Sequence, residues 1–175
     1  NTAIDKAGNL DASYDGLNIQ KEQSGFNNTL DNTAAKFIGL NDQSVLSADS
    51  PIFDTTQGTV SAWFNVDNLN NDYAVFSKDG NSDVDGQFYV GVDSNGDIYG
   101  RLQNGGTENH FAYDPTAAIG DKVHAGQWYM LTMTYGAGGA DFYLNGQLVG
   151  SDPILTRTNS DRGFMIGGHG IICIG

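Results

Sequence analysis

Cysteine is almost absent from this chain, since Cys173 is the only one in 175 residues. A single cysteine excludes an intrachain disulfide and any metal site built from several thiolates. It leaves secretion open, because a large enough core can stabilise a secreted domain without disulfides. Apolar runs of about 18 residues are also missing, so we expect no membrane insertion. The sequence contains no charged-then-apolar leader, and from its abrupt beginning at Asn1 we expect a processed or excised segment.

Basic residues are scarce as well. The chain has 8 lysines and arginines against 21 acidic residues, which gives a net charge of −13. This charge repels polyphosphates and anionic lipids, so we exclude nucleic acid as a partner. Only Glu22 and Glu108 are glutamates, and the other acidic residues are aspartates. Aspartate with abundant glycine and asparagine is typical of turns, and it also supplies oxygen ligands for Ca²⁺.

What the chain does have is a clear hairpin signal between Gly126 and Val149. An apolar run from Trp128 to Tyr135 is followed by a glycine-rich turn, a second apolar run, and then Asn145-Gly146. Asn-Gly between apolar runs predicts a type I′ turn, which needs φ > 0 at both central residues. The glycine-rich turn and the Asn145-Gly146 turn each predict a hairpin, and two consecutive hairpins form a three-stranded antiparallel meander.

Short strands separated by turn residues recur along most of the chain. Thr59–Asp67 alternates between apolar and polar residues, and Ile52-Phe53 reads as a short helical turn. This spacing predicts an all-β protein, an antiparallel sandwich or jelly roll in one domain over residues 1–175. The other predicted strands are near Leu17–Ile19, Ala35–Leu40, Tyr73–Lys78, Gln87–Asp93, Asp97–Gln103, His110–Tyr113 and Gly163–Gly167.

Several of these segments together resemble the laminin-G-like domains, in the bacterial branch of the concanavalin A-like lectin/glucanase superfamily. The resemblance covers about residues 34–168, and Gln127-Trp128 followed by Tyr143-Leu144-Asn145-Gly146 is its most specific part. The remaining segments that carry it are Thr59–Asp67, Phe76–Gly80, Gln87–Val92 with Asn95-Gly96, and Phe164–Gly168.

The resemblance implies a two-sheet jelly roll with a non-catalytic role in binding glycans or other extracellular ligands, often with Ca²⁺ at its rim. Two departures stand out, because the family's usual first and last strands have no counterpart in this sequence. Its two terminal strands normally lie side by side, and unpaired edges are a liability that proteins cover. We therefore expect either a fragment, or a neighbouring chain or segment that supplies the missing strands.

The loop after Lys78 is the candidate calcium site. Its residues Asp79, Asn81, Asp83 and Asp85 place an oxygen-bearing side chain at every second position, as loops that curl around a cation do. It is not an EF-hand, because Val84 stands where that loop needs glycine. The alternative is a solvated polar turn without metal. For the similar Asp93–Asp97 segment we favour the turn, since Asn95-Gly96 explains its composition.

Four further residues are candidates for ligand binding: Asn109, His110, Tyr113 and His169. Glycines flank His169 and permit close approach of a ligand, and an aromatic ring such as Tyr113 can pack on a sugar face. Core packing is the alternative for the aromatic residues. The three histidines are too widely spaced for a zinc site. We expect Trp63 and Trp128 in the core, since each lies in an apolar strand.

Catalysis is the competing function, because the superfamily also contains glycoside hydrolases. The enzymes of the superfamily share a Glu-x-Asp-x-x-Glu strand motif, which supplies the two carboxylates that retaining hydrolysis needs. This chain cannot contain that motif with only Glu22 and Glu108. We therefore predict no enzyme.

The sequence thus predicts a secreted or cell-surface module for adhesion, which binds carbohydrate or an extracellular protein, with calcium as its cofactor. The alternative is a structural or assembly subunit of a surface filament or large adhesin that binds no glycan.

Overall fold

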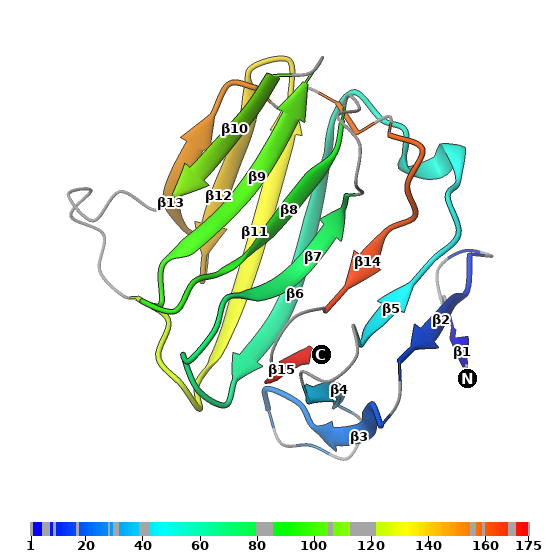
Figure 1. Cartoon of the computed structure of the whole chain (residues 1–175), viewed down its shortest axis with the longest axis vertical. Helices are drawn as coiled ribbons and strands as arrows, with labels where there is room; N and C mark the ends of the chain where they lie inside the picture. The colour runs from blue at the N-terminus through cyan, green and yellow to red at the C-terminus, as the bar shows by residue number, and fades with distance from the viewer. Residues whose placement is uncertain are drawn as a thin grey trace.

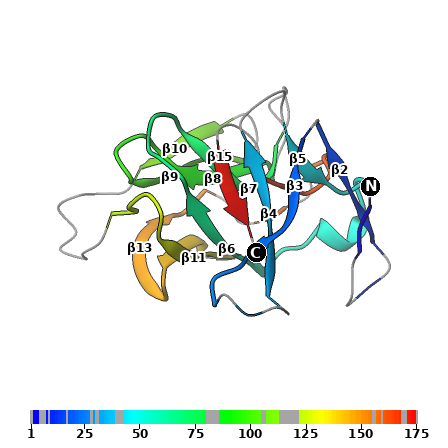
Figure 2. The same ribbon diagram turned by 90° about the horizontal axis from the view of Figure 1, so that it is seen from below.

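The protein is a sandwich of two antiparallel β-sheets (Figure 1). The structure, a computed structural model, describes residues 2–4, 8, 10–16, 18–27, 29, 32–38, 43–79, 86–104, 107–112, 122–154, 157–158, 160–167 and 171–174. One sheet has eight strands in the order β1-β2-β5-β14-β7-β8-β9-β10. The other has seven in the order β13-β12-β11-β6-β15-β4-β3. Figure 2 shows the two layers, with β8, β9 and β10 above β6, β11 and β13.

The strands of the eight-stranded sheet are β1 (Thr2–Ala3), β2 (Ala12–Asp15), β5 (Ser44–Leu46), β7 (Tyr73–Lys78), β8 (Phe88–Val92), β9 (Ile98–Asn104), β10 (Thr107–Ala112) and β14 (Met165–Ile166). Those of the seven-stranded sheet are β3 (Gln20–Ser24), β4 (Thr33–Ile38), β6 (Gly58–Val66), β11 (Trp128–Gly136), β12 (Gly139–Leu144), β13 (Gln147–Asp152) and β15 (Ile171–Ile174). A 3₁₀ helix, η1 (Pro51–Phe53), is the one helical element of the described residues. None of their helices is long and apolar enough to cross a membrane.

The core lies between the sheets and follows the period-two alternation of the sequence. Phe64 and Val66 of β6 are fully buried, and so are Leu131 and Met133 of the neighbouring β11. Because successive side chains of a strand point to opposite faces, the residues between them face away from the core. The alternation predicted for Thr59–Asp67 is therefore confirmed, and the all-β jelly-roll sandwich is confirmed with it.

The meander predicted from Gly126 to Val149 is present as β11, β12 and β13. Asn145 and Gly146 have φ values of 51° and 80°, the left-handed conformation that a type I′ turn requires. Asn145 also reaches back to β11, because its Oδ1 accepts a hydrogen bond of 2.9 Å from the Met130 amide. Its own amide donates to the Met130 carbonyl at 2.8 Å. The turn residue thus ties the hairpin to the third strand.

Two segments differ from the sequence-based prediction. Of the strand expected near Leu17–Ile19, Asn18 and Ile19 lie between β2 and β3 and belong to neither, and Leu17 lies outside the described residues. Ile171–Ile174 forms β15, a strand that we did not predict, between β4 and β6. The prediction that a neighbouring chain or segment completes the sheets stays a prediction.

Candidate functional site

The outer face of the eight-stranded sheet carries a strip of aromatic and charged side chains on the β8–β9 hairpin. Phe88 and Val90 of β8 are buried in the core, so Tyr89 between them faces outward. The same alternation on β9 turns Tyr99 and Arg101 outward. Together with Asp79, at the end of β7, these residues are called the tyrosine strip below: Asp79, Tyr89, Tyr99 and Arg101.

The two tyrosines of the strip form a pair. Their rings meet edge to face, with centroids 5.4 Å apart and planes at 72°, and their hydroxyls are hydrogen-bonded to each other. Burial raises the pKa of the Tyr89 hydroxyl well above its ordinary value, and the hydrogen bond with Tyr99 raises it further. Burial also raises the pKa of Tyr99, where the same hydrogen bond acts in the opposite direction. Each ring is only partly buried, so both present surface to solvent.

Arg101 and Asp79 form an ion pair at the other end of the strip. The Arg101 side chain is 24% exposed and that of Asp79 is 23% exposed, so the pair is sheltered but reachable from solvent. Paired charges have defined positions and can offer hydrogen-bond donors and acceptors to a ligand without rearrangement. The strip therefore combines aromatic surface with fixed polar groups.

The strand β10 runs beside this strip and contains two of the predicted ligand-binding residues. In the β9–β10 register His110 is the partner of Arg101, and Asn109 is the partner of Leu102, a core residue. The fold therefore brings His110 to the same row of the sheet as Tyr89 and Arg101. The other two candidates, Tyr113 and His169, lie outside the described residues.

Of the predicted calcium ligands, Asp79 is described, while Asn81, Asp83 and Asp85 lie outside the described residues. Within the described ranges no three His, Cys, Asp or Glu side chains are close enough together to hold a metal ion. At the far end of the same loop Gln87 is fully buried. Neither Oε1 nor Nε2 of its side-chain amide has a hydrogen-bond partner among the residues that the structure describes. A buried amide without a partner costs about 1–3 kcal/mol.

The Asp93–Asp97 segment is the turn that we favoured from its composition. One carboxylate oxygen of Asp93 accepts hydrogen bonds from the amides of Asn95 and Asp97, both at 2.8 Å. Gly96 has a φ of 83°, which glycine adopts without strain. The aspartate here closes the β8–β9 hairpin.

The two tryptophans are not in the core, so that prediction was wrong. Trp63 and Trp128 are half-buried on the outer face of the seven-stranded sheet. Trp63 is covered by Phe26, whose ring stacks on it at 4.3 Å between centroids with planes 5° apart. The alternation of β6 and β11 assigns both tryptophans to the outer face, and this pattern outweighs their hydrophobicity.

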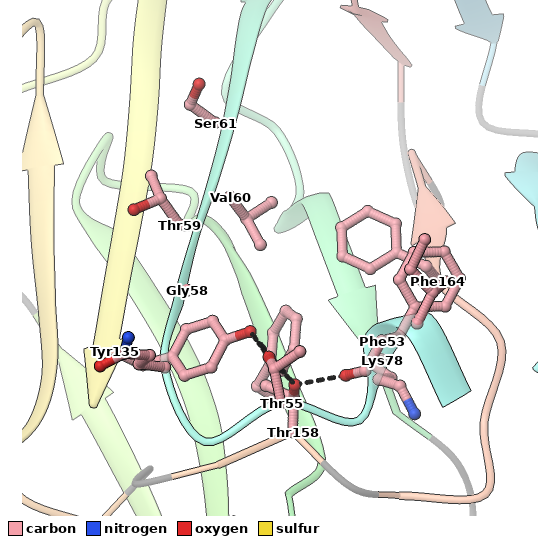
Figure 3. Close-up of a pocket in the computed structure, with 13 residues that line it drawn as sticks. Phe53, Thr55, Gly58, Thr59, Val60, Ser61, Lys78, Tyr135, Thr158 and Phe164 are labelled. Atoms are coloured by element: carbon pink, nitrogen blue, oxygen red, sulfur yellow. Dashed lines mark hydrogen bonds between the residues drawn. The ribbon is translucent and has the colours of Figure 1, made fainter. Parts of the chain in front are cut away.

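A second feature is a cavity of about 430 Å³ beside the first half of β6 (Figure 3). Its apolar wall includes Phe53, Phe88 and Phe164. At its rim the hydroxyl of Tyr135 is 2.6 Å from that of Thr55, and the Thr158 hydroxyl donates to the Phe53 carbonyl at 2.5 Å (Figure 3). These hydroxyls are thus already engaged with one another and with the backbone.

Lys78 forms part of the same cavity and points into the sandwich. Its side chain is 1% exposed, and its ammonium lies 3.3 Å from Asp54 and 3.5 Å from Asp49. It also donates to the carbonyl of Ser160 and lies 3.3 Å from the Ser160 hydroxyl. A buried ammonium needs such partners, since taking an unpaired charge out of water is costly. Lys78 therefore joins the η1 segment to the loop before β14.

The sequence contains a signal for the tyrosine strip that we did not use. Gln87–Val92 and Ile98–Gln103 both alternate, and their outward positions include Tyr89, Tyr99 and Arg101. On one face of a hairpin such positions become cross-strand neighbours. No sequence signal indicates the cavity, because its residues come from six separate stretches of the chain.

The two packed antiparallel sheets define a sandwich domain of the lectin type. A family model described as the concanavalin A-like lectin/glucanases superfamily matches residues 39–170, so the chain belongs to this family. The laminin-G-like resemblance is thereby confirmed. A search of curated proteins found no match.

Solved structures with the same fold include receptor-binding domains of botulinum neurotoxins. That of serotype D superposes with a TM-score of 0.67 at 18% identity, covering 95% of this chain and 43% of that one. A serotype D domain in complex with N-acetylneuraminic acid gives 0.66 at 20% identity, covering 95% and 41%. A structure of botulinum neurotoxin type C, whose cell entry is dependent upon interaction with two ganglioside molecules, has a TM-score of 0.62 at 20% identity, covering 95% of this chain and 42% of that one.

At these identities the likeness shows the fold alone, and the chain spans about two-fifths of the length of these structures. The family's description includes lectins as well as glucanases, and the neighbours named above are receptor-binding domains, so the prediction of a non-catalytic module is consistent with both.

Proposed function

We propose that the domain binds a glycan through the tyrosine strip. The observation that carries this proposal is the combination on one outer face of the Tyr89–Tyr99 ring pair and the Arg101–Asp79 ion pair. Aromatic rings provide apolar area at low entropic cost, and the neighbouring charged groups provide oriented hydrogen bonds. Sugar rings need both kinds of contact, since they have apolar C–H faces and a rim of hydroxyls. His110 on the adjacent β10 extends the same row.

Two structural neighbours support a carbohydrate as the ligand class. Cell entry of one of these toxins depends on gangliosides, and the binding domain of the other is in complex with N-acetylneuraminic acid. N-acetylneuraminic acid is a sugar with a carboxylate, and the guanidinium of Arg101 is a group that can pair with a carboxylate. The strip also contains Asp79, which competes for that guanidinium. We therefore assign the strip to a glycan without choosing between charged and neutral sugars.

Calcium is part of the proposal as the cofactor of the loop that begins at Asp79. Asn81, Asp83 and Asp85 would complete its oxygen ligands, as their spacing predicts. Asp79 would have to share its carboxylate between the cation and Arg101. Bound calcium would fix one end of the strip and place a charge beside the sugar hydroxyls.

Glycan-array binding, with calcium or with EDTA, tests the function. We expect binding that weakens at least about tenfold, or 1.4 kcal/mol, in both Tyr89→Ala and Arg101→Ala. Tyr143→Ala is the matched control, because Tyr143 is a half-buried tyrosine of β12 in the other sheet. Binding lost equally in all three variants would place the site elsewhere.

EDTA separates the cofactor from the ligand. If the calcium assignment is right, EDTA lowers both the melting temperature and the glycan affinity, and added calcium restores them. Glycan binding that is insensitive to EDTA would remove calcium from the proposal and leave the strip intact. Binding to no glycan would favour the structural or assembly role instead. In either role we place the domain outside the cell or on its surface.

A further inference from the structure

The tyrosine strip continues toward the β8–β9 turn into a group of carboxylates. In the register of this hairpin Gly91 is the partner of Tyr99, and in the next row the Asp93 amide donates to the Asp97 carbonyl at 2.9 Å. Asp93 is four residues from Tyr89, and Asp97 is two residues from Tyr99. Because side chains alternate along a strand, both aspartates continue the outer face that carries the tyrosines.

A third carboxylate, Asp72, reaches the same end of the strip from the loop between β6 and β7. Its Oδ1 accepts a hydrogen bond of 3.0 Å from the Ser94 amide, which holds Asp72 against the β8–β9 turn. Tyr73 at the start of β7 pairs with Val92 at the end of β8, so this loop and the turn lie at one end of the sheet (Figure 1). We call Asp72, Asp93 and Asp97 the acidic end of the strip.

The negative charge of these side chains acts on both tyrosines. Burial raises the pKa of each hydroxyl most, and neighbouring carboxylates raise it further. Asp72 and Asp79 act on Tyr89, while Asp72 and Asp93 act on Tyr99. A field that disfavours a negative phenolate also disfavours a negative group of a ligand at the same place.

The cations beside the strip do not offset this field. Arg101 is paired with Asp79 at the other end of the strip, and the Lys122 ammonium lies 3.1 Å from Asp97 Oδ2. The described charged side chains at the strip and its acidic end are thus four carboxylates and two cations, a balance of −2. An acidic sugar that paired with Arg101 would have to compete with Asp79 for the guanidinium.

The row of Tyr99 leaves room for a sugar at the acidic end. Its hairpin partner Gly91 has no side chain, and a Cβ added there would meet the Tyr73 carbonyl oxygen, so the row stays bare. The Tyr99 ring is partly buried and Asp72 is exposed, so both present surface to a ligand. A sugar can pack its C–H face on such a ring. A protonated amine on that sugar is attracted both by the ring and by the carboxylates.

We propose that the tyrosine strip selects glycans by charge: it rejects sugars that carry a carboxylate or sulfate, and a free, protonated amine on the sugar strengthens binding. This inference rests on the proposed glycan binding, and it names the class of sugar that the strip takes. Asp72 is the specificity-determining residue, since its charge acts on both tyrosines. The selectivity is opposite to that of the neighbour in complex with N-acetylneuraminic acid, which is an acidic sugar.

A glycan array of matched pairs tests the selectivity, because the members of each pair differ by one kind of charged group. The pairs are sialylated and desialylated forms of the same oligosaccharides, and chitosan and chitin oligomers of equal length, all read at one calcium concentration. We expect each sialylated form to bind at least about fivefold more weakly than its partner, and chitosan to bind more tightly than chitin. Both differences should shrink as salt is added, since salt screens charges near the surface.

Asp72→Asn removes the charge and keeps an oxygen that can accept the hydrogen bond from the Ser94 amide. It should reduce the difference within each pair at least about twofold. Asp141→Asn is the matched control, because it changes the net charge of the domain equally. Asp141 lies on β12 of the other sheet, where its Oδ1 accepts a hydrogen bond of 2.5 Å from the Ser151 hydroxyl. The differences should be unchanged in this variant.

Two outcomes would overturn the selectivity and leave glycan binding standing. One is a sialylated form that binds as tightly as its desialylated partner, or more tightly. The other is an equal effect of Asp72→Asn and Asp141→Asn, which would assign the preference to overall charge. Binding to no member of any pair would remove the proposed function and the selectivity together. If Asp72→Asn does not fold, the salt dependence of the unmodified domain decides, since differences that persist at high salt do not come from this field.

Discussion

Phe26 lies flat on Trp63, with 4.3 Å between the ring centroids and 5° between the planes. Phe26 belongs to the loop between β3 and β4, so this contact fastens that loop to the outer face of β6. Phe26 is 41% exposed, while Trp63 beneath it is half-buried. Phe26 therefore shields the Trp63 ring from water.

Removing the covering ring should expose the tryptophan. We expect Phe26→Ala to lower the free energy of unfolding by about 1 kcal/mol, the value of an aromatic pair beyond its area. The fluorescence of Trp63 should shift to longer wavelength, measured in a Trp128→Phe background where Trp63 is the sole tryptophan. Leu148→Ala is the control, since Leu148 is 44% exposed on β13. An unshifted emission spectrum would mean that Phe26 does not cover Trp63 in solution.

Lys78 and its two aspartates should respond unequally to substitution. Asp49 and Asp54 are 45% and 37% exposed, so they remain solvated without the lysine, whereas the lysine is buried. We expect the double substitution Asp49→Asn with Asp54→Asn to lower the free energy of unfolding by about 2–3 kcal/mol, which is less than the loss for a fully buried ion pair. Lys78→Met should lower the free energy of unfolding by less than this double substitution. Urea unfolding compares them, and a larger loss in Lys78→Met would contradict this order.

Asn145 contributes both a backbone conformation and a hydrogen bond, and two substitutions separate them. Asn145→Gly keeps the φ of 51° accessible but loses the bond to the Met130 amide, at a cost of about 0.5–1.5 kcal/mol. Asn145→Ala should cost about 1–2 kcal/mol more, because alanine is strained in the left-handed region. Thermal unfolding measures both. Equal losses would show that conformation contributes nothing here.

The tyrosine pair predicts a loss of stability in alkali. The folded-state pKa of Tyr89 is raised above the unfolded value of about 10. The stability that this shift contributes is therefore complete below pH 10 and declines as the pH rises above it. The decline approaches about 1.4 kcal/mol per pH unit for one proton. Tyr89→Phe should reduce this slope in urea unfolding between pH 9.5 and about 11. Between pH 7 and 9 the difference between variant and parent should stay constant, and a difference that drifts there would implicate another group.

Local patterns in the sequence were sufficient for the hairpins and for the faces of β6 and β11. Asn145-Gly146 favours a left-handed turn by its own residue types, and Val60 to Val66 has an apolar residue at every second position. Ile171–Ile174 has no alternation, so its place between β4 and β6 depends on partners far away in the chain. The covering of Trp63 depends likewise on a distant residue, Phe26.

The candidate site was less predictable for the same reason. Asp79 was selected for its loop spacing, yet its partner in the structure is Arg101, two strands further along the chain. His110 was a candidate for ligand binding from the sequence, and only the register of β10 places it beside Arg101. Residue type and spacing thus identified members of the site, whereas cross-strand pairing determines which of them meet.

Both tryptophans of the chain lie on the outer face of the seven-stranded sheet, while the tyrosine strip lies on the opposite layer. The intrinsic tryptophan emission of this domain is therefore a reporter for one layer only. A glycan bound at Tyr89 and Tyr99 could leave that emission unchanged at saturation. Near-ultraviolet circular dichroism of the tyrosines, or calorimetry, is the suitable readout for titrations of this face.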